Sequence, residues 1–384
     1  MQNNTVLKEL ICLNSGEADI ACTGNNMWFN GKPNYADFTK ELKESIQNND
    51  VRGSILIATD SEIIWASGSR SVDGNGETVT PLSTYEIGSI TKMHTAAVIF
   101  QLIDEGKLAL TDQVTAYFPA YTKANGMTIF DLLHMRSGMV DFANDCETFF
   151  RNDEALMEAL DNGEITDEVF LEHLYALELV FEPGSKMEYC NTNYVLLAMI
   201  IEKITGKSYR ENVRERIFEP LGMDCSSAVT SGDVTSVPEG KYGYMKEYQI
   251  ARGAGDIHSN VLDLLKFDRA FFREQIVSPA GKAGMLDFVD GYGCGWEASQ
   301  RYADLVSHDG ETNSYYCLNY AFHASGPEKR CYFLMLTCCN EDDDDDEDEE
   351  ETAAAESEGA EDNEEDEEFN QYQLIFDICK KYLL

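Results

Sequence analysis

The pattern of hydrophobic and polar positions begins with an amphipathic stretch and a pair of apolar runs. Residues 34–49 carry apolar side chains at helical spacing, which predicts a helix with one buried stripe. The residues of that stripe are Phe38, Leu42 and Ile46. The runs Gly53–Thr59 and Glu62–Gly68 follow, separated by two polar residues, and this arrangement predicts a β-hairpin.

The middle of the chain, about residues 110–270, is dominated by helical periodicity and predicts a mostly helical lobe. Strand-like patterns return after it, at about residues 291–297, 303–307, 314–323 and 330–339. Together with the early hairpin, these segments would form one antiparallel sheet into which the helical lobe is inserted. The pattern therefore predicts an α+β fold, in a chain of 384 residues that is long enough for two lobes.

The last part of the chain combines an acidic segment with a final apolar pattern. Residues 341–368 contain 20 Asp or Glu and no Lys or Arg, so we expect a disordered loop there. Residues 369–384 show helical periodicity again, which predicts a terminal helix packed on the sheet. Its apolar face comprises Tyr372, Ile375, Cys379 and Tyr382. The folded domain would then consist of residues 35–340 and 369–384.

The charge of the chain limits its partners. The formal net charge is −41, and outside the acidic segment there are still 50 acidic residues against 29 basic ones. Such a surface argues against binding to nucleic acid, which needs clustered Lys and Arg, and against docking on anionic membranes. The acidic loop is interpreted as a solvated spacer, with a docking site for a basic partner or for cations as the alternative.

Cysteine usage and the first residues of the chain bear on its location. The eleven cysteines are scattered without C-x-x-C pairs, a pattern that fits reduced thiols better than a disulfide framework. Residues 1–30 lack the basic and apolar regions of a signal peptide, and no apolar run is long enough for a membrane helix. We therefore expect a cytoplasmic protein that does not enter the membrane.

The strongest chemical signal is the tetrad Ser89-Ile90-Thr91-Lys92, which lies where an extended segment gives way to an apolar helix. Residues three apart share a helix face, so Lys92 would place its amine beside the Ser89 hydroxyl. The start of a helix also offers unpaired N–H groups that favour negative charge. Serine is a weak nucleophile until a base takes its proton, and this arrangement supplies a candidate base.

Two further clusters follow the tetrad in the chain. Tyr189-Cys190-Asn191 begins 100 positions after Ser89, and His308-Asp309-Gly310 begins 119 positions after Tyr189. No G-x-S-x-G elbow, phosphate-binding loop or dinucleotide-binding glycine motif is present. The histidines have no H-x-H or H-E-x-x-H spacing, so we expect no metal and no cofactor.

The order S-x-x-K, Y-x-N, H-x-G resembles that of the penicillin-recognising serine hydrolases. It is similar to the branch with class C β-lactamases, serine D-Ala-D-Ala carboxypeptidases and related esterases. Supporting segments are Leu108–Val114, Thr128–Met139 and Tyr292–Trp296. The resemblance implies an antiparallel sheet flanked by helices, an inserted helical region and an active site in the cleft between them.

The resemblance also implies roles for the motif residues. Ser89 would form an acyl-enzyme, and either Lys92 or Tyr189 would take its proton. The ordinary pKa of tyrosine, about 10, makes it a poor base, but two nearby cations, for which Lys92 and His308 are candidates, would favour its phenolate. Asn191 would position Lys92 and the substrate amide.

The third motif would supply part of the oxyanion hole and also departs from the family. The backbone N–H groups of Ser89 and Glu311 would bind the oxyanion beside Gly310. Relatives usually carry Thr or Ser at the position of Asp309, where the hydroxyl helps to hold a substrate carboxylate. We therefore predict a serine hydrolase for small esters or for peptide and amide substrates without that carboxylate. The alternatives are a β-lactamase or D-amino-acid-specific peptidase, and a catalytically silent binding protein with the same fold.

Overall fold

The structure is a computed structural model in which part of the chain is described. The described residues are 20–23, 27–30, 35–49, 51–68, 79–151, 153–162, 164–228, 250–312, 315–323, 330–338 and 370–383. The predicted acidic loop at residues 341–368 lies outside them.

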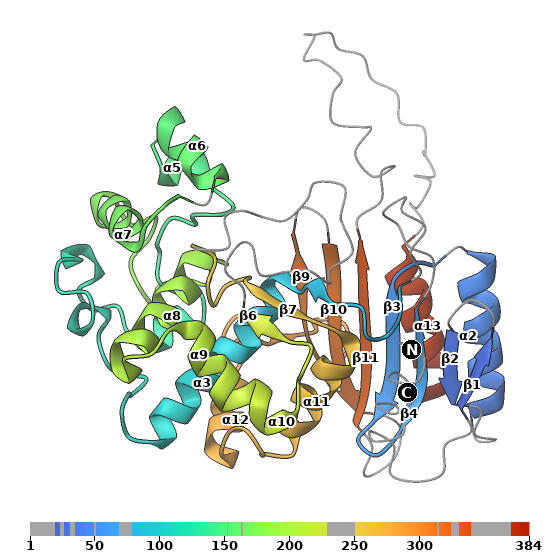
Figure 1. Ribbon diagram of the computed structural model, residues 1–384. Coiled ribbons are helices and arrows are strands. Elements are labelled where there is room, and N and C mark those ends of the chain that lie inside the picture. Colours follow the sequence, from blue (N-terminus) through green and yellow to red (C-terminus); the bar gives the residue numbers. More distant parts are fainter. Residues whose placement is uncertain are drawn as a thin grey trace, which may run out of the picture.

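An eight-stranded antiparallel sheet forms one side of the molecule (Figure 1). Its strands, in spatial order, are β1 (Ile20–Thr23), β2 (Met27–Asn30), β4 (Ile63–Gly68), β3 (Ser54–Thr59), β11 (Arg330–Cys338), β10 (Tyr315–His323), β9 (Leu305–Glu311) and β8 (Glu297–Ala298). The early hairpin β3–β4 therefore joins the late strands directly, because β3 pairs with β11. The predicted α+β fold with one antiparallel sheet is confirmed.

Two helices cover the outer face of this sheet (Figure 1). They are α2 (Ala36–Asn48) and α13 (Gln371–Leu383), which are far apart in the sequence and pack against each other. Their apolar residues, among them Leu42 and Phe376, form a core with sheet residues such as Phe333. The predicted terminal helix thus packs on the sheet, and burial of its apolar face is the main reason for its stability.

The other face of the sheet packs against the helical part of the chain (Figure 1). Its helices are α3 (Thr91–Asp104), α4 (Ile129–Leu133), α5 (Cys146–Phe149), α6 (Glu154–Asp161), α7 (Asp167–Ala176), α8 (Asn191–Thr205), α9 (Tyr209–Val213), α10 (Glu219–Leu221), α11 (Val261–Phe272) and α12 (Pro279–Met285). A small sheet of β5 (Tyr85–Glu86), β7 (Ile257–Ser259) and β6 (Ser227–Ala228) lies within this part. Helix α3 is buried on almost every side, which explains its continuous apolar sequence.

One predicted strand is wrong over most of its length. The segment at about residues 291–297 forms a tight turn, in which the Gly293 N–H donates to the Trp296 carbonyl. Gly295 adopts a left-handed φ of 72°, which a strand does not contain. Only Glu297–Ala298 is a strand, and it pairs with β9. The turn brings the backbone of Gly295 against that of Lys92. The glycines that suggested a strand here instead allow the two backbones to approach each other closely.

Candidate active site

Ser89 lies in a single helical turn, Gly88–Ile90, that leads directly into α3. The Ile87 N–H just before it donates to the Ile257 carbonyl at 3.0 Å, which fixes the turn to the small sheet. Gly88 is buried and adopts a positive φ of 49°. A Cβ on Gly88 would lie 2.9 Å from the Glu311 nitrogen, so glycine lets β9 approach the turn.

Lys92 is completely buried one helical turn after Ser89, with its amine beside the hydroxyl. Its Nζ is within hydrogen-bonding distance of Ser89 Oγ (2.7 Å), Asn191 Oδ1 (2.7 Å) and the Ala254 carbonyl (2.8 Å). Burial lowers the pKa of Lys92 to about 7, while the charges of Asp141, Asp309 and others oppose that shift. A neutral amine would keep two N–H groups on the carbonyl acceptors and turn its lone pair to Ser89.

Tyr189 contacts the same hydroxyl from the segment just before α8. Its OH donates to Ser89 Oγ at 2.7 Å. Burial raises the pKa of Tyr189 well above 10, and the charges of Glu297, Asp309 and Asp141 raise it further. The prediction that two cations favour a phenolate is therefore wrong, because Tyr189 is a protonated hydrogen-bond donor in these surroundings.

Asn191 begins α8 and links Lys92 to an acidic residue that the motifs did not include. The side-chain amide of Asn191 donates to Asp141 Oδ2 at 3.0 Å, and its backbone N–H donates to the same oxygen at 3.0 Å. This double contact turns Oδ1 of Asn191 towards Lys92. Asp141 therefore orients Asn191 and stabilises the start of α8, where negative charge is favourable.

The third motif lies on β9, whose backbone runs along the nucleophile turn. A Cβ on Gly310 would lie 2.0 Å from the Ile87 carbonyl oxygen and 2.9 Å from the Ser89 nitrogen. The Thr312 N–H donates to the Tyr315 carbonyl, so the alternation of an antiparallel ladder turns the Glu311 N–H away from β10. That N–H points to the side of the nucleophile turn, as the predicted oxyanion hole requires.

His308 is buried between the lobes and is neutral. Its Nδ1 donates to the Asp309 carbonyl at 2.6 Å, because a carbonyl can only accept. Its Nε2 lies 3.1 Å from the Tyr292 hydroxyl and accepts from it. Burial and the charge of Lys92 lower the pKa of His308 to about 3. His308 therefore does not supply the second cation that was expected beside Tyr189.

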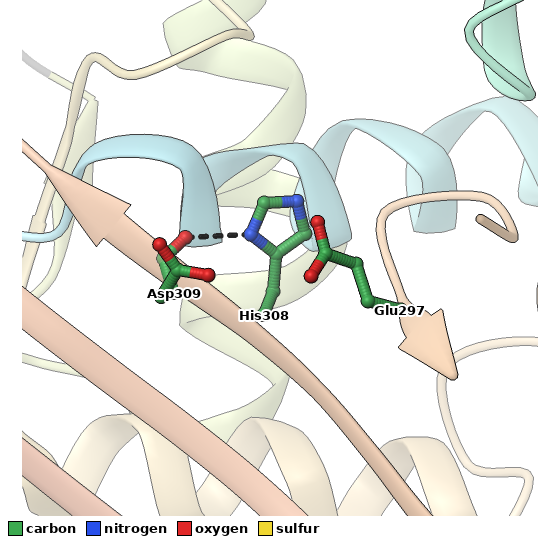
Figure 2. A group of neighbouring side chains, drawn as sticks. All are labelled: Glu297, His308 and Asp309. Carbon is green, nitrogen blue, oxygen red and sulfur yellow. Dashed lines mark hydrogen bonds between the residues drawn. The ribbon is translucent and has the colours of Figure 1, made fainter. Parts of the chain in front are cut away.

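Asp309 lies beside a second carboxylate, that of Glu297 in β8. Figure 2 shows the His308 ring between the two carboxylates. One ligand atom of each of the three residues lies within 4.8 Å of the others, so these residues could hold a cation. Burial and the charge of Asp309 raise the pKa of Glu297 to about 7, and burial also raises the pKa of Asp309.

The structure thus brings together all the residues named from the motifs, together with four further contributors. Ser89, Lys92, Tyr189 and Asn191 form one hydrogen-bonded group, and the β9 backbone adjoins it. The contributors that the sequence analysis missed are Asp141, Ala254, Tyr292 and Glu297. Asp141 follows a segment already noted for its resemblance to the family, and Tyr292 lies within another, so both carried a weak signal. The Ala254 carbonyl and Glu297 carried none.

Comparison with known proteins gives three findings. A family model described as Beta-lactamase matches residues 40–356. A penicillin-binding protein of Bacillus subtilis is 28% identical over 315 residues, which are 73% of this chain and 67% of the relative. A teichoic acid D-alanine hydrolase of Staphylococcus aureus is 24% identical over 253 residues, which are 62% of this chain and 59% of the relative.

A solved structure resembles the fold over most of the chain. The D-amino acid amidase from Ochrobactrum anthropi SV3, in complex with L-phenylalanine, aligns with a TM-score of 0.63. The alignment covers 78% of this chain and 91% of the amidase, at 24% identity. Among the helices that the structure describes, none is long and apolar enough to cross a membrane.

Proposed function

Because the chain belongs to the beta-lactamase family, we propose that it is a serine acyl hydrolase that forms an acyl-enzyme on Ser89. One observation carries this proposal. The Ser89 hydroxyl lies 2.7 Å from both the Lys92 amine and the Tyr189 hydroxyl, so a base and a proton donor meet at one candidate nucleophile. The penicillin-binding proteins and hydrolases among its relatives support the same class of reaction.

Lys92 is the proposed base for acylation. Its pKa of about 7 leaves a large fraction as free amine at neutral pH, whereas Tyr189 is protonated there. The Ser89 proton passes to Lys92 Nζ as Oγ attacks the carbonyl carbon of the substrate. The carbonyl π electrons move to oxygen, and the backbone N–H groups of Ser89 and Glu311 bind that oxyanion.

Tyr189 is the proposed proton donor to the leaving group. As the tetrahedral intermediate collapses, the bond to the alcohol or amine breaks and the leaving atom takes a proton from Tyr189. Both groups lie 2.7 Å from Ser89 Oγ, so the proton held by Lys92 passes within the site to the Tyr189 oxygen and restores its hydroxyl. Water then attacks the acyl-enzyme with the same groups acting in reverse, which releases the acid and regenerates Ser89.

The favoured substrates are small esters or amides without a carboxylate near the scissile bond. Asp309 and Glu297 would repel such a group. A D-amino-acid-specific amidase or peptidase is the second candidate, because relatives are named for D-alanine and D-amino acid substrates. A β-lactamase is disfavoured by the same carboxylates, and a silent binding protein by the intact contacts of Ser89.

The domain bounds, the cellular location and the role of the acidic segment are also proposals. The folded domain would comprise residues 35–340 and 369–384, with the acidic segment between its last strand and α13. A cytoplasmic location is supported by the thiols of Cys146, Cys190, Cys294 and Cys379, none of which forms a disulfide. A basic partner for the acidic segment is the alternative to a simple spacer.

A substrate screen tests the proposed function. Purified protein should hydrolyse p-nitrophenyl acetate or another small ester, and should hydrolyse a chromogenic cephalosporin more slowly. The Ser89→Ala variant should lose turnover and keep its circular dichroism spectrum and melting temperature. Equal turnover by the variant would contradict a nucleophilic Ser89, and fast cephalosporin hydrolysis would favour the β-lactamase alternative.

A further inference from the structure

Two carboxylates beside the nucleophile have no cationic partner of their own. Glu297 and Asp309 approach each other within 4.8 Å through their ligand atoms (Figure 2). Within the described part of the chain, neither forms an ion pair, although the charge of Lys92 acts to lower the pKa of both. Burying two like charges together is costly unless a cation or a proton accompanies them.

The two carboxylates are carried by β8 and β9, and β9 adjoins the nucleophile turn. Glu297 pairs with Ser307 on β9, two residues before Asp309. The backbone of Gly295 abuts the Lys92 carbonyl, and that of Gly310 abuts the Ser89 nitrogen. The charges of Glu297 and Asp309 also act on Lys92 and Tyr189, the two side chains that hold the Ser89 hydroxyl.

The cationic groups nearby form no hydrogen bond or ion pair with these two carboxylates. Lys92 directs its amine to Ser89, Asn191 and the Ala254 carbonyl, and the proposed mechanism needs it as a free amine. His308 is neutral. The net charge of the whole chain, −41, also favours the approach of cations over anions. A substrate that brings its own positive charge would complete the site.

We propose that Glu297 and Asp309 bind a free ammonium group of the substrate, which makes aminoacyl esters and amides the preferred class. This inference rests on the proposed function of Ser89. The three N–H bonds of an ammonium group suit the oxygens of two carboxylates. A divalent metal is a weaker alternative, because both ring nitrogens of His308 already have partners, the Asp309 carbonyl and the Tyr292 hydroxyl.

Paired substrates that differ only in charge test the proposal. Alanine p-nitroanilide, as either enantiomer, carries an ammonium group that its N-acetyl derivative lacks. Wild-type protein should prefer the free amine by about tenfold or more in kcat/KM for the accepted enantiomer, which corresponds to about 1.4 kcal/mol. Glu297→Gln and Asp309→Asn should each lower kcat/KM for the free amine far more than for the N-acetyl substrate, and so remove most of that preference.

The control is Asp304→Asn, which removes an exposed carboxylate just before β9 and should change neither substrate. A loss shared equally by both substrates would assign Glu297 and Asp309 a structural role and overturn the proposal. A wild-type preference for the N-acetyl substrate would overturn it too.

A binding measurement separates this proposal from the proposed function. In calorimetry with the Ser89→Ala protein, alaninamide should bind at least about tenfold more tightly than N-acetylalaninamide, and Glu297→Gln should abolish the difference. Selective binding without any turnover by the wild type would refute the hydrolase but support the ammonium site. Binding of ZnCl₂ that depends on Glu297, with no selectivity for alaninamide, would replace the ammonium site by a metal site.

Discussion

At the scale of single residues, the proposed activation of Ser89 depends on the protonation state of Lys92. Burial brings the pKa of Lys92 down from 10.5 to about 7. A base works in its unprotonated form, so kcat/KM for a neutral ester should rise about tenfold per pH unit below 7 and level off above it. Tyr189 stays protonated across this range, because its pKa is raised well above 10.

A pH–rate profile of the wild type and the Glu297→Gln variant checks this prediction. Glu297 is the control because its pKa is also about 7, and its removal should leave the acidic limb in place for a neutral substrate. If the rise in kcat/KM had an apparent pKa near 10, the ordinary value of lysine, the proposed role of Lys92 would be contradicted. If the Glu297→Gln variant lost the rise in kcat/KM with pH, the titrating group would be the Glu297 carboxylate and not the Lys92 amine.

At the scale of elements, the proposed oxyanion hole depends on the contact between β9 and the nucleophile turn. Gly310→Ala would put a methyl group 2.0 Å from the Ile87 carbonyl oxygen, which must push β9 away from Ser89. We expect turnover to fall by about a hundredfold, the usual scale for the loss of one oxyanion donor. Gly255→Ala is the matched control, since its Cβ would lie 3.9 Å from the same turn, an ordinary contact.

Ester kinetics together with thermal unfolding check this prediction. Gly255→Ala should keep turnover within a few-fold. Full activity in Gly310→Ala would show that the Glu311 N–H does not bind the oxyanion. A shared loss of activity in both variants would mean that any added volume near the turn is harmful, and the specific role of β9 would then be contradicted.

The elements also show what could be predicted from the sequence. The resemblance to the penicillin-recognising serine hydrolases is confirmed at the level of the family. Helix α13 followed from local periodicity, because it buries one apolar face, and the hairpin β3–β4 followed from two continuous apolar runs, which are buried throughout. The segment Tyr292–Trp296 was misassigned, because its apolar residues mask a left-handed turn at Gly295.

The site was predictable only where local spacing determines geometry. Ser89 and Lys92 are one helical turn apart, so their contact follows from the chain itself. Glu297 meets Asp309 only through the pairing of β8 with β9, a contact between segments that no local pattern encodes. The charge states were equally hidden, since burial of Tyr189 and His308 depends on the closure of the two lobes around them.

At the scale of the whole molecule, the terminal helix is expected to matter more than the acidic segment before it. Replacing Asp342–Glu367 by a short Gly/Ser linker should leave turnover and melting temperature nearly unchanged, because so acidic a segment buries little apolar surface. Ending the chain at Glu368 should destabilise it by several kcal/mol, because Ile375, Phe376 and Cys379 leave the core under the sheet.

Urea unfolding and ester turnover of both variants check this expectation. Loss of activity after linker replacement alone would contradict the interpretation of the segment as a spacer. An unchanged unfolding midpoint in the truncated chain would contradict the packing of α13 on the sheet.

The central claim is that Ser89 is the nucleophile, and intact-protein mass spectrometry after treatment with an activated fluorophosphonate tests it most directly. The wild type should gain the mass of one phosphonyl group, and peptide mapping should place it on Ser89. Ser185→Ala, which removes an exposed serine near Tyr189, should label as the wild type does. Ser89→Ala should remain unlabelled, and labelling of that variant to the same extent would contradict the account.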